Sequence, residues 1–140
     1  MSRIVGNDLG TTNSLVAYMK EGHPCVIPGR NARTMVPSVV AMTDNGLLVG
    51  DPAKEHLTRN PEQTVYSVKR FMGKALEDVQ GELAYFPYSL TEQGGVIRIK
   101  LGEKSYSPPQ ISAMILKELK QRAEAHLGES ITKAVITVPA

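Results

Sequence analysis

Residues 8–13 (DLGTTN) combine an acid, a glycine, two hydroxyls and an amide. Gly10 can adopt a positive φ and let a phosphate oxygen approach the backbone N–H groups. Thr11 and Thr12 add hydroxyl donors beside it. Asp8 would hold a hydrated Mg²⁺ without touching the phosphate, because Mg²⁺ keeps several waters when it bridges a nucleotide. The pattern indicates a phosphate-binding turn, and an ordinary β-hairpin turn built from Asp, Gly and Asn explains it equally well.

Two apolar, β-forming segments flank this turn. Residues 3–5 lead into it, residues 15–19 lead out of it, and residues 24–27 follow after a further short turn. The sequence therefore predicts three antiparallel strands at the start of the fold. The turn matches neither common glycine-rich nucleotide motif, since no Gly-Lys-Ser/Thr follows it and the sequence has no Gly-x-Gly-x-x-Gly.

Two cations, Lys69 and Arg70, fall near the end of a second segment of interest. Asn60-Pro61 is a typical helix start and Gly73 a typical helix end, so a helix is predicted over residues 64–71. Cations in the last turn of a helix complement its dipole. The residues by themselves therefore favour a structural role for both cations.

Residues 37–107 carry the signals of a second, smaller lobe. Residues 44–46 (DNG) predict a tight hairpin turn. Asp51 is expected to cap a short helix that ends near Thr58. Strands are expected within or at residues 35–42, 47–49, 86–90, 96–101 and 104–106.

The C-terminal third predicts one long helix followed by one strand. Residues 108–127 begin with two prolines, place apolar residues at helical spacing and are followed by Gly128. Residues 133–138 are rich in β-branched side chains, as in a parallel strand. We expect this strand to lie beside the first strand, joined to it through a right-handed crossover.

Composition excludes several classes of protein. The 140 residues are 41% hydrophobic and 21% charged, and 16 basic against 14 acidic residues leave a net charge of +2, which gives no reason to expect nucleic acid or a membrane as a partner. The single cysteine, Cys25, cannot form an internal disulfide. The three histidines show no metal-binding spacing. The first residues lack the pattern of a signal peptide, so a cytoplasmic location is expected.

Residues 8–14 resemble the first phosphate loop of the heat-shock protein 70 (DnaK-type) chaperones, which belong to the actin and sugar-kinase superfamily. Further sequence blocks resemble those of this family in order and spacing. They lie at residues 49–54, 60–65, 68–73, 109–113 and 134–140. The resemblance covers nearly the whole chain and points to the N-terminal part of the nucleotide-binding domain. Its chaperone-specific blocks disfavour a small-molecule kinase of the same superfamily.

The resemblance implies a fold, a site and partners. The fold would be α/β, a partial actin-like (ribonuclease H-like) ATPase lobe formed by residues 1–36 and 108–140, with residues 37–107 as an inserted α+β lobe. The cofactors would be ATP, ADP and Mg²⁺. In the complete protein the partners would be unfolded polypeptide clients, a J-domain co-chaperone and a nucleotide exchange factor. The implied site residues are Lys69 and Thr11 for catalysis, Gly10, Thr11, Thr12 and Asn13 for the nucleotide, and Asp8 for water-bound Mg²⁺.

In the family, the second phosphate loop, the remaining magnesium ligands and the peptide-binding cleft lie beyond the last block. The chain is therefore expected to supply one wall of an ATP site and to show no significant turnover by itself. A non-catalytic role as an interaction or folding fragment is the alternative. The exposed edge of the last strand is expected to favour self-association.

Two further residues stand out against the family pattern. Asn7 occupies a position in the first strand where the family commonly has an apolar residue, and a buried amide without a partner would cost about 1–3 kcal/mol. Pro139 matches a proline linked in the family to communication between domains, for which a strand-ending role is expected here.

Overall fold

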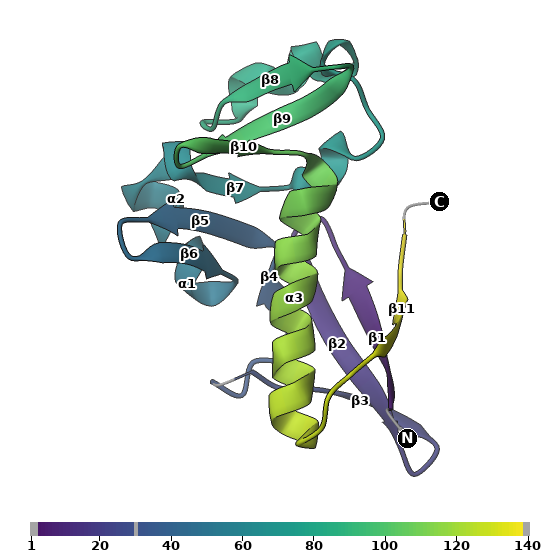
Figure 1. The fold of residues 1–140 in the computed structure, drawn as a ribbon. Coiled ribbons are helices and arrows are strands. Elements are labelled where there is room, and N and C mark those ends of the chain that lie inside the picture. Colours follow the sequence, from purple (N-terminus) through teal and green to yellow (C-terminus); the bar gives the residue numbers. More distant parts are fainter. Residues whose placement is uncertain (1–2, 30, 139–140) are drawn as a thin grey trace.

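One long helix, α3 (Pro108–Leu127), runs beside three β-sheets in the computed structural model (Figure 1). The structure describes residues 3–29 and 31–138, so Pro139 lies outside the described residues. Ser107 caps the helix, because its side chain accepts a bond from the N–H of Gln110, and Gly128 ends it in the left-handed conformation. The mixed α/β class and the long helix are confirmed, whereas the boundaries of the two lobes stay a prediction.

The largest sheet contains the N-terminal hairpin and the last strand of the described chain. Its order is β11-β1-β2-β3, and the short β4 also pairs with β2. The last strand runs parallel to β1 with Val5 opposite Ala134, as predicted, and it forms an exposed edge. The strands are β1 (Ile4–Leu9), β2 (Asn13–Lys20), β3 (His23–Val26), β4 (Val36–Pro37) and β11 (Lys133–Ile136).

Two three-stranded sheets lie toward the N-terminal end and the middle of α3 (Figure 1). One has the order β6-β5-β7 and consists of β5 (Val39–Thr43), β6 (Gly46–Val49) and β7 (Thr64–Tyr66). The other has the order β10-β9-β8 and consists of β8 (Leu90–Gln93), β9 (Val96–Leu101) and β10 (Lys104–Tyr106). The predicted strand over residues 86–90 is wrong in position, because β8 begins only at Leu90.

The predicted helix over residues 64–71 is also wrong. Thr64–Tyr66 form β7, which pairs with β5, and Val68–Phe71 form only a short 3₁₀ helix. Ser67 separates the two with a left-handed backbone, φ 55°. β-branched and aromatic side chains suit a strand position, and the open edge of β5 offered backbone partners that a helix would have left unused.

The helix expected after Asp51 is broken into α1 (Asp51–Lys54) and α2 (His56–Arg59). Asp51 does not cap α1, since the N-cap residue is Gly50 and no side chain caps the helix. The Asp51 carboxylate instead accepts a hydrogen bond from Arg33 at 3.3 Å. Two other 3₁₀ segments follow: Pro61–Gln63 lies between α2 and β7, and Leu76–Tyr85 lies between the two small sheets along the chain.

The buried apolar residues form two main cores, one at each end of α3. The aromatic core lies between α3 and the small sheets; its largest side chains include Phe71, Tyr88, Ile97, Ile99, Leu101, Ile111 and Ile115. The sheet core lies between α3 and the large sheet and consists of Val5, Val16, Ile27, Val36, Leu119, Ala123 and Ile131. The helix therefore joins two packing environments through successive turns of one face.

Among the described residues, no helix is long and apolar enough to cross a membrane.

Candidate functional site

Residues 10–13, here named the 10–13 loop, follow β1 and end with Asn13, the first residue of β2. Gly10 does not adopt a positive φ, which corrects the expectation from the sequence. Its lack of a side chain matters for a different reason. A Cβ at Gly10 would lie 2.1 Å from the carbonyl oxygen of Asn13, so any other residue would force the loop open. Glycine is therefore required for the tight closure of the loop on itself.

Protein donors bind the carbonyl groups of this loop. The Nζ of Lys69 donates to the carbonyl of Leu9 at 2.6 Å. Ser38 donates twice, from Oγ to the carbonyl of Gly10 at 2.7 Å and from its backbone N–H to the carbonyl of Thr12 at 2.8 Å. The Ser38 Oγ also lies 2.8 Å from the Ser14 Oγ, and both serines are buried. Lys69 and Ser38, which lies between β4 and β5, thus fix the loop by hydrogen bonds to its carbonyls and to that of Leu9.

The donors of the loop are left available. Within residues 3–29 and 31–138, the hydroxyls of Thr11 and Thr12 have no hydrogen-bond partner, and the loop N–H groups of residues 10–12 take no part in the turn and loop hydrogen bonds. Thr12 and Asn13 are exposed and Thr11 is half-buried. The loop therefore has N–H and O–H donors without a partner in the described chain, while the carbonyls of Gly10 and Thr12 and of the preceding Leu9 are bonded, an arrangement that suits an anion.

Asp8 lies at the end of β1 with its side chain exposed. Its Oδ1 accepts a hydrogen bond from the Thr137 hydroxyl at 3.0 Å, and the same hydroxyl lies 3.2 Å from the N–H of Leu9, from which it accepts. The backbone N–H of Thr137 donates to the carbonyl of Asn7 at 3.0 Å, which extends the parallel pairing of β1 and β11. Thr137 therefore orients the carboxylate beside the loop and leaves its second oxygen unused.

The structure brings Lys69 to the loop and directs Arg70 away from it. Lys69 is half-buried, whereas Arg70 is exposed and approaches Glu82 at 4.0 Å. The helix-dipole explanation for both cations fails, because they lie in a four-residue 3₁₀ segment. Lys69 reaches Leu9 across 60 positions of sequence and keeps two N–H groups beyond the one it donates. Its role in catalysis stays a prediction.

Sequence reasoning missed two residues that hold the site, Ser38 and Thr137. The register of β11 against β1 could have indicated Thr137, since it follows the strand predicted to lie beside Asp8. The sequence carried no comparable signal for Ser38, because its role depends on where the β4–β5 connection crosses the hairpin.

The residues beside the loop fit Mg²⁺ only in part. Mg²⁺ is commonly held by one or two carboxylates together with waters and substrate phosphates, and Asp8 supplies one such carboxylate. The described residues hold no group of three or more His, Cys, Asp or Glu side chains that could bind a metal without a phosphate ligand. Asp8 is therefore suited to a metal that arrives with a phosphate.

A comparison with protein-family models supports the resemblance found in the sequence. The model described as Hsp70 protein matches residues 4–140, which include both strands of the hairpin, the 10–13 loop, Lys69 and Thr137. The match thus spans almost the whole chain. On this evidence the chain belongs to the Hsp70 family.

Proposed function

We propose that this chain forms one wall of the ATP site of a chaperone that uses ATP to bind and release unfolded polypeptides. The observation that carries the proposal is the division of hydrogen bonds at the 10–13 loop. Ser38 donates to the carbonyls of Gly10 and Thr12 and Lys69 to that of Leu9 just before the loop, while the hydroxyls of Thr11 and Thr12 and the loop N–H groups of residues 10–12 have no partner in the described chain. Membership of the Hsp70 family supports the proposed chaperone activity and the proposed nucleotide ligand.

The proposed chemistry is electrostatic. Phosphoryl transfer depends on charges placed in advance around the γ-phosphate, because negative charge spreads over its oxygens in the transition state. Lys69 would offer its two remaining N–H groups to the γ-phosphate or the attacking water, and Thr11 would donate its hydroxyl. Gly10, Thr12 and Asn13 would contact the phosphates of ATP or ADP.

Asp8 would bind the waters of a Mg²⁺ ion that neutralises phosphate charge when it is present. Thr137 supports this role, because its hydroxyl holds one carboxylate oxygen and leaves the other available. These groups surround only one side of the phosphates, so we expect binding without significant turnover from these residues alone.

The family relationship extends the proposal to architecture and partners. An actin-like lobe with a right-handed crossover between α3 and β11 is proposed for the large sheet. In the complete protein we propose unfolded polypeptide clients, a J-domain co-chaperone and a nucleotide exchange factor as partners. The exposed β11 edge is a proposed site of self-association.

Isothermal titration of ATP with Mg²⁺ into the folded chain tests the nucleotide proposal. Saturable binding is expected, with a loss of about tenfold or more in affinity for Asp8→Ala and for Lys69→Ala, since each removes a charge beside the phosphates. Lys74→Ala is the matched control, because Lys74 is exposed and lies outside the site. No binding by a folded chain, or equal affinity in all four proteins, would refute the proposal.

A further inference from the structure

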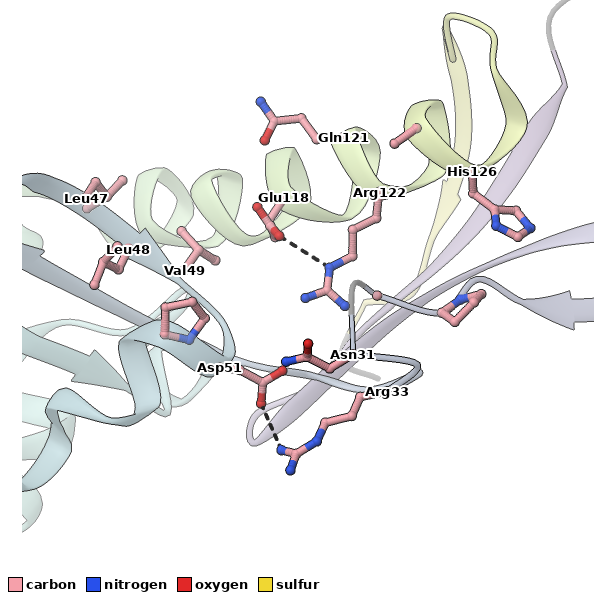
Figure 2. Close-up of a pocket in the computed structure, with 14 residues that line it drawn as sticks. Asn31, Arg33, Leu47, Leu48, Val49, Asp51, Glu118, Gln121, Arg122 and His126 are labelled. Atoms are coloured by element: carbon pink, nitrogen blue, oxygen red, sulfur yellow. Dashed lines mark hydrogen bonds and ion pairs between the residues drawn. The ribbon is translucent and has the colours of Figure 1, made fainter.

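A cavity of about 630 Å³ lies away from the 10–13 loop, between the C-terminal half of α3, residues 28, 29, 31 and 33, and the β6–α1 corner (Figure 2). One wall is apolar and includes Leu47, Leu48, Val49 and Pro52. Figure 2 shows the side chain of Arg122 entering this space from α3, with Asn31, Arg33 and Asp51 on the opposite side. The role proposed above for the 10–13 loop leaves this cavity without a function.

Arg122 is the unusual residue of this cavity. Its side chain is 15% exposed and makes one ion pair, from Nε to the Glu118 carboxylate at 3.3 Å. Its Nη1 is fully buried and has no hydrogen-bond partner among the described residues. A guanidinium carries five N–H donors in a planar fork, so most of its donors remain unused. An unpaired buried donor of this kind costs stability.

The backbone around Arg122 leaves room for its guanidinium. A Cβ at Gly29 would lie 2.2 Å from Nη1, so only glycine lets the guanidinium pack here. Gly50 also lies near the guanidinium, since a Cβ there would make an ordinary van der Waals contact with Nη2 at 3.9 Å. The bond to Glu118 thus holds the Nε end of the guanidinium, while Nη1 packs against Gly29 and, like Nη2, makes no hydrogen bond within the described chain.

The charged groups around the cavity indicate the charge of a ligand that would bind there. Its two carboxylates are already paired, Glu118 with Arg122 and Asp51 with Arg33, and the Arg33 pair is exposed and therefore weak. His126 at the rim is exposed and its ring packs against Tyr18. The orphaned buried atom of the cavity is a donor, so the missing partner is an acceptor. Arginine pairs best with planar or tetrahedral oxyanions that accept two N–H bonds.

We propose that this cavity binds a small molecule that carries a phosphate or carboxylate group on an apolar body. Arg122 holds the oxyanion through Nη1 and Nη2, with a small shift of the guanidinium to uncover Nη1. The exposed guanidinium of Arg33 and the carboxamide of Asn31 face the oxyanion from the opposite wall. The apolar body lies on the surface formed by Leu47, Val49 and Pro52. This site is separate from the proposed nucleotide site and does not depend on it.

Nuclear magnetic resonance of the ¹⁵N-labelled chain tests the proposal, with the Nε–Hε signal of Arg122 as the readout. Phenyl phosphate and benzoate are titrated in parallel, with phenol as the neutral control and inorganic phosphate to measure the contribution of the apolar body. We expect a saturable shift with a Kd in the millimolar range for at least one aromatic oxyanion. Phenol should cause no such shift, and inorganic phosphate should bind more weakly than phenyl phosphate. Comparison of phenyl phosphate with benzoate decides which oxyanion the cavity prefers.

Single-residue variants test whether the ligand binds at Arg122. Binding to Arg122→Gln and to its matched control Arg59→Gln is followed by calorimetry, since Arg59 is exposed on α2. Arg122→Gln should weaken binding by about tenfold or more, and Arg59→Gln should leave it unchanged. Asp51→Asn removes a competing carboxylate and should strengthen binding by up to about fivefold, which provides a test even if Arg122→Gln fails to fold.

The outcomes separate this proposal from the nucleotide proposal. Shifts confined to residues 10–13, or equal binding by wild type, Arg122→Gln and Asp51→Asn, would overturn the cavity site while leaving the ATP site untouched. The absence of a saturable shift with every oxyanion would overturn it as well. Retained oxyanion binding in an Asp8→Ala chain that no longer binds ATP would support the cavity site independently.

Discussion

The two ends of α3 contact two different cores, and the buried polar groups beside these cores differ in whether they have hydrogen-bond partners. At its N-terminal end, the aromatic core buries one polar group of note, the Tyr88 hydroxyl, and this donates to the carbonyl of Tyr66 at 2.6 Å. At its C-terminal end, beside the sheet core, two buried polar atoms have no partner within the described chain, Oδ1 of Asn7 and Nη1 of Arg122. Polar groups are thus satisfied at one end and partly unsatisfied at the other.

This difference has a physical consequence for mutation. Removing a satisfied group loses its hydrogen bond or its packing, so stability should fall. Removing an orphaned group relieves a desolvation cost, so stability should rise unless the group serves a ligand. Asn7 and Arg122 therefore require different tests, because a ligand is proposed for Arg122 and none for Asn7.

The largest effect is expected in the aromatic core. Phe71 is 1% exposed and packs edge-on against Phe86 with ring centroids 5.0 Å apart. Phe71→Ala should lower the free energy of unfolding by about 3–5 kcal/mol, because it leaves a cavity in a filled core. Urea denaturation measures this, with Tyr85→Ala as the control, since Tyr85 is 76% exposed. Similar losses in both variants would mean that the aromatic core is not close-packed.

An increase in stability is expected when Asn7, which is 6% exposed, is replaced by an apolar residue. Asn7→Ile should raise the free energy of unfolding by about 1–3 kcal/mol, because an unpaired carboxamide oxygen is replaced by apolar surface beside Val5 and Val16. Thermal denaturation followed by circular dichroism measures the change. Asn7→Val is the smaller alternative if isoleucine overpacks the site. An unchanged melting temperature in both would show that the amide finds a partner in solution.

At the 10–13 loop, Ser38→Ala should cost about 1–3 kcal/mol, because the Gly10 carbonyl and the Ser14 hydroxyl lose a buried partner. It should also weaken ATP binding, since the loop is no longer fixed. Ser38→Thr keeps the hydroxyl and should restore most of the binding. Denaturation and calorimetry measure the two effects. Wild-type ATP affinity in a destabilised Ser38→Ala chain would separate loop stability from nucleotide binding.

The smallest effect concerns Tyr88 and appears mainly at high pH. Burial raises the pKa of the Tyr88 hydroxyl, with a further contribution from nearby Tyr66. The unfolded chain ionises this group near pH 10, so its contribution to stability is present below about pH 10 and is lost as the pH rises further. Tyr88→Phe should cost about 1 kcal/mol at pH 7 and reduce the fall in stability above pH 10.

Thermal melts between pH 7 and 11 measure this effect. Tyr85→Phe serves as the control, because an exposed tyrosine should leave the pH dependence unchanged. If the Tyr88→Phe and wild-type curves stay parallel above pH 10, the hydroxyl does not titrate differently in the folded chain.

Much of the fold was predictable because its signals are local. The hairpin turn at residues 44–46 and the limits of α3 depend on neighbouring residues, and they were found where expected. The helix predicted over residues 64–71 was wrong because β7 owes its conformation to the edge of β5. Asp51 was misassigned for a similar reason, since its carboxylate turns toward Arg33 and leaves the helix end uncapped.

The same division applies to the candidate site. The sequence alone indicated candidate groups for a phosphate, Gly10, Thr11 and Thr12, and Asp8 for its hydrated Mg²⁺, because their chemistry and spacing lie within one short segment. It could not determine that Lys69 lies beside Leu9, or that Ser38 and Thr137 hold the loop and the carboxylate. Those contacts join segments that only the packing of separate elements brings together, and only the tertiary structure decided them. Hydrogen bonds act over about 3 Å in space, whatever the distance along the chain.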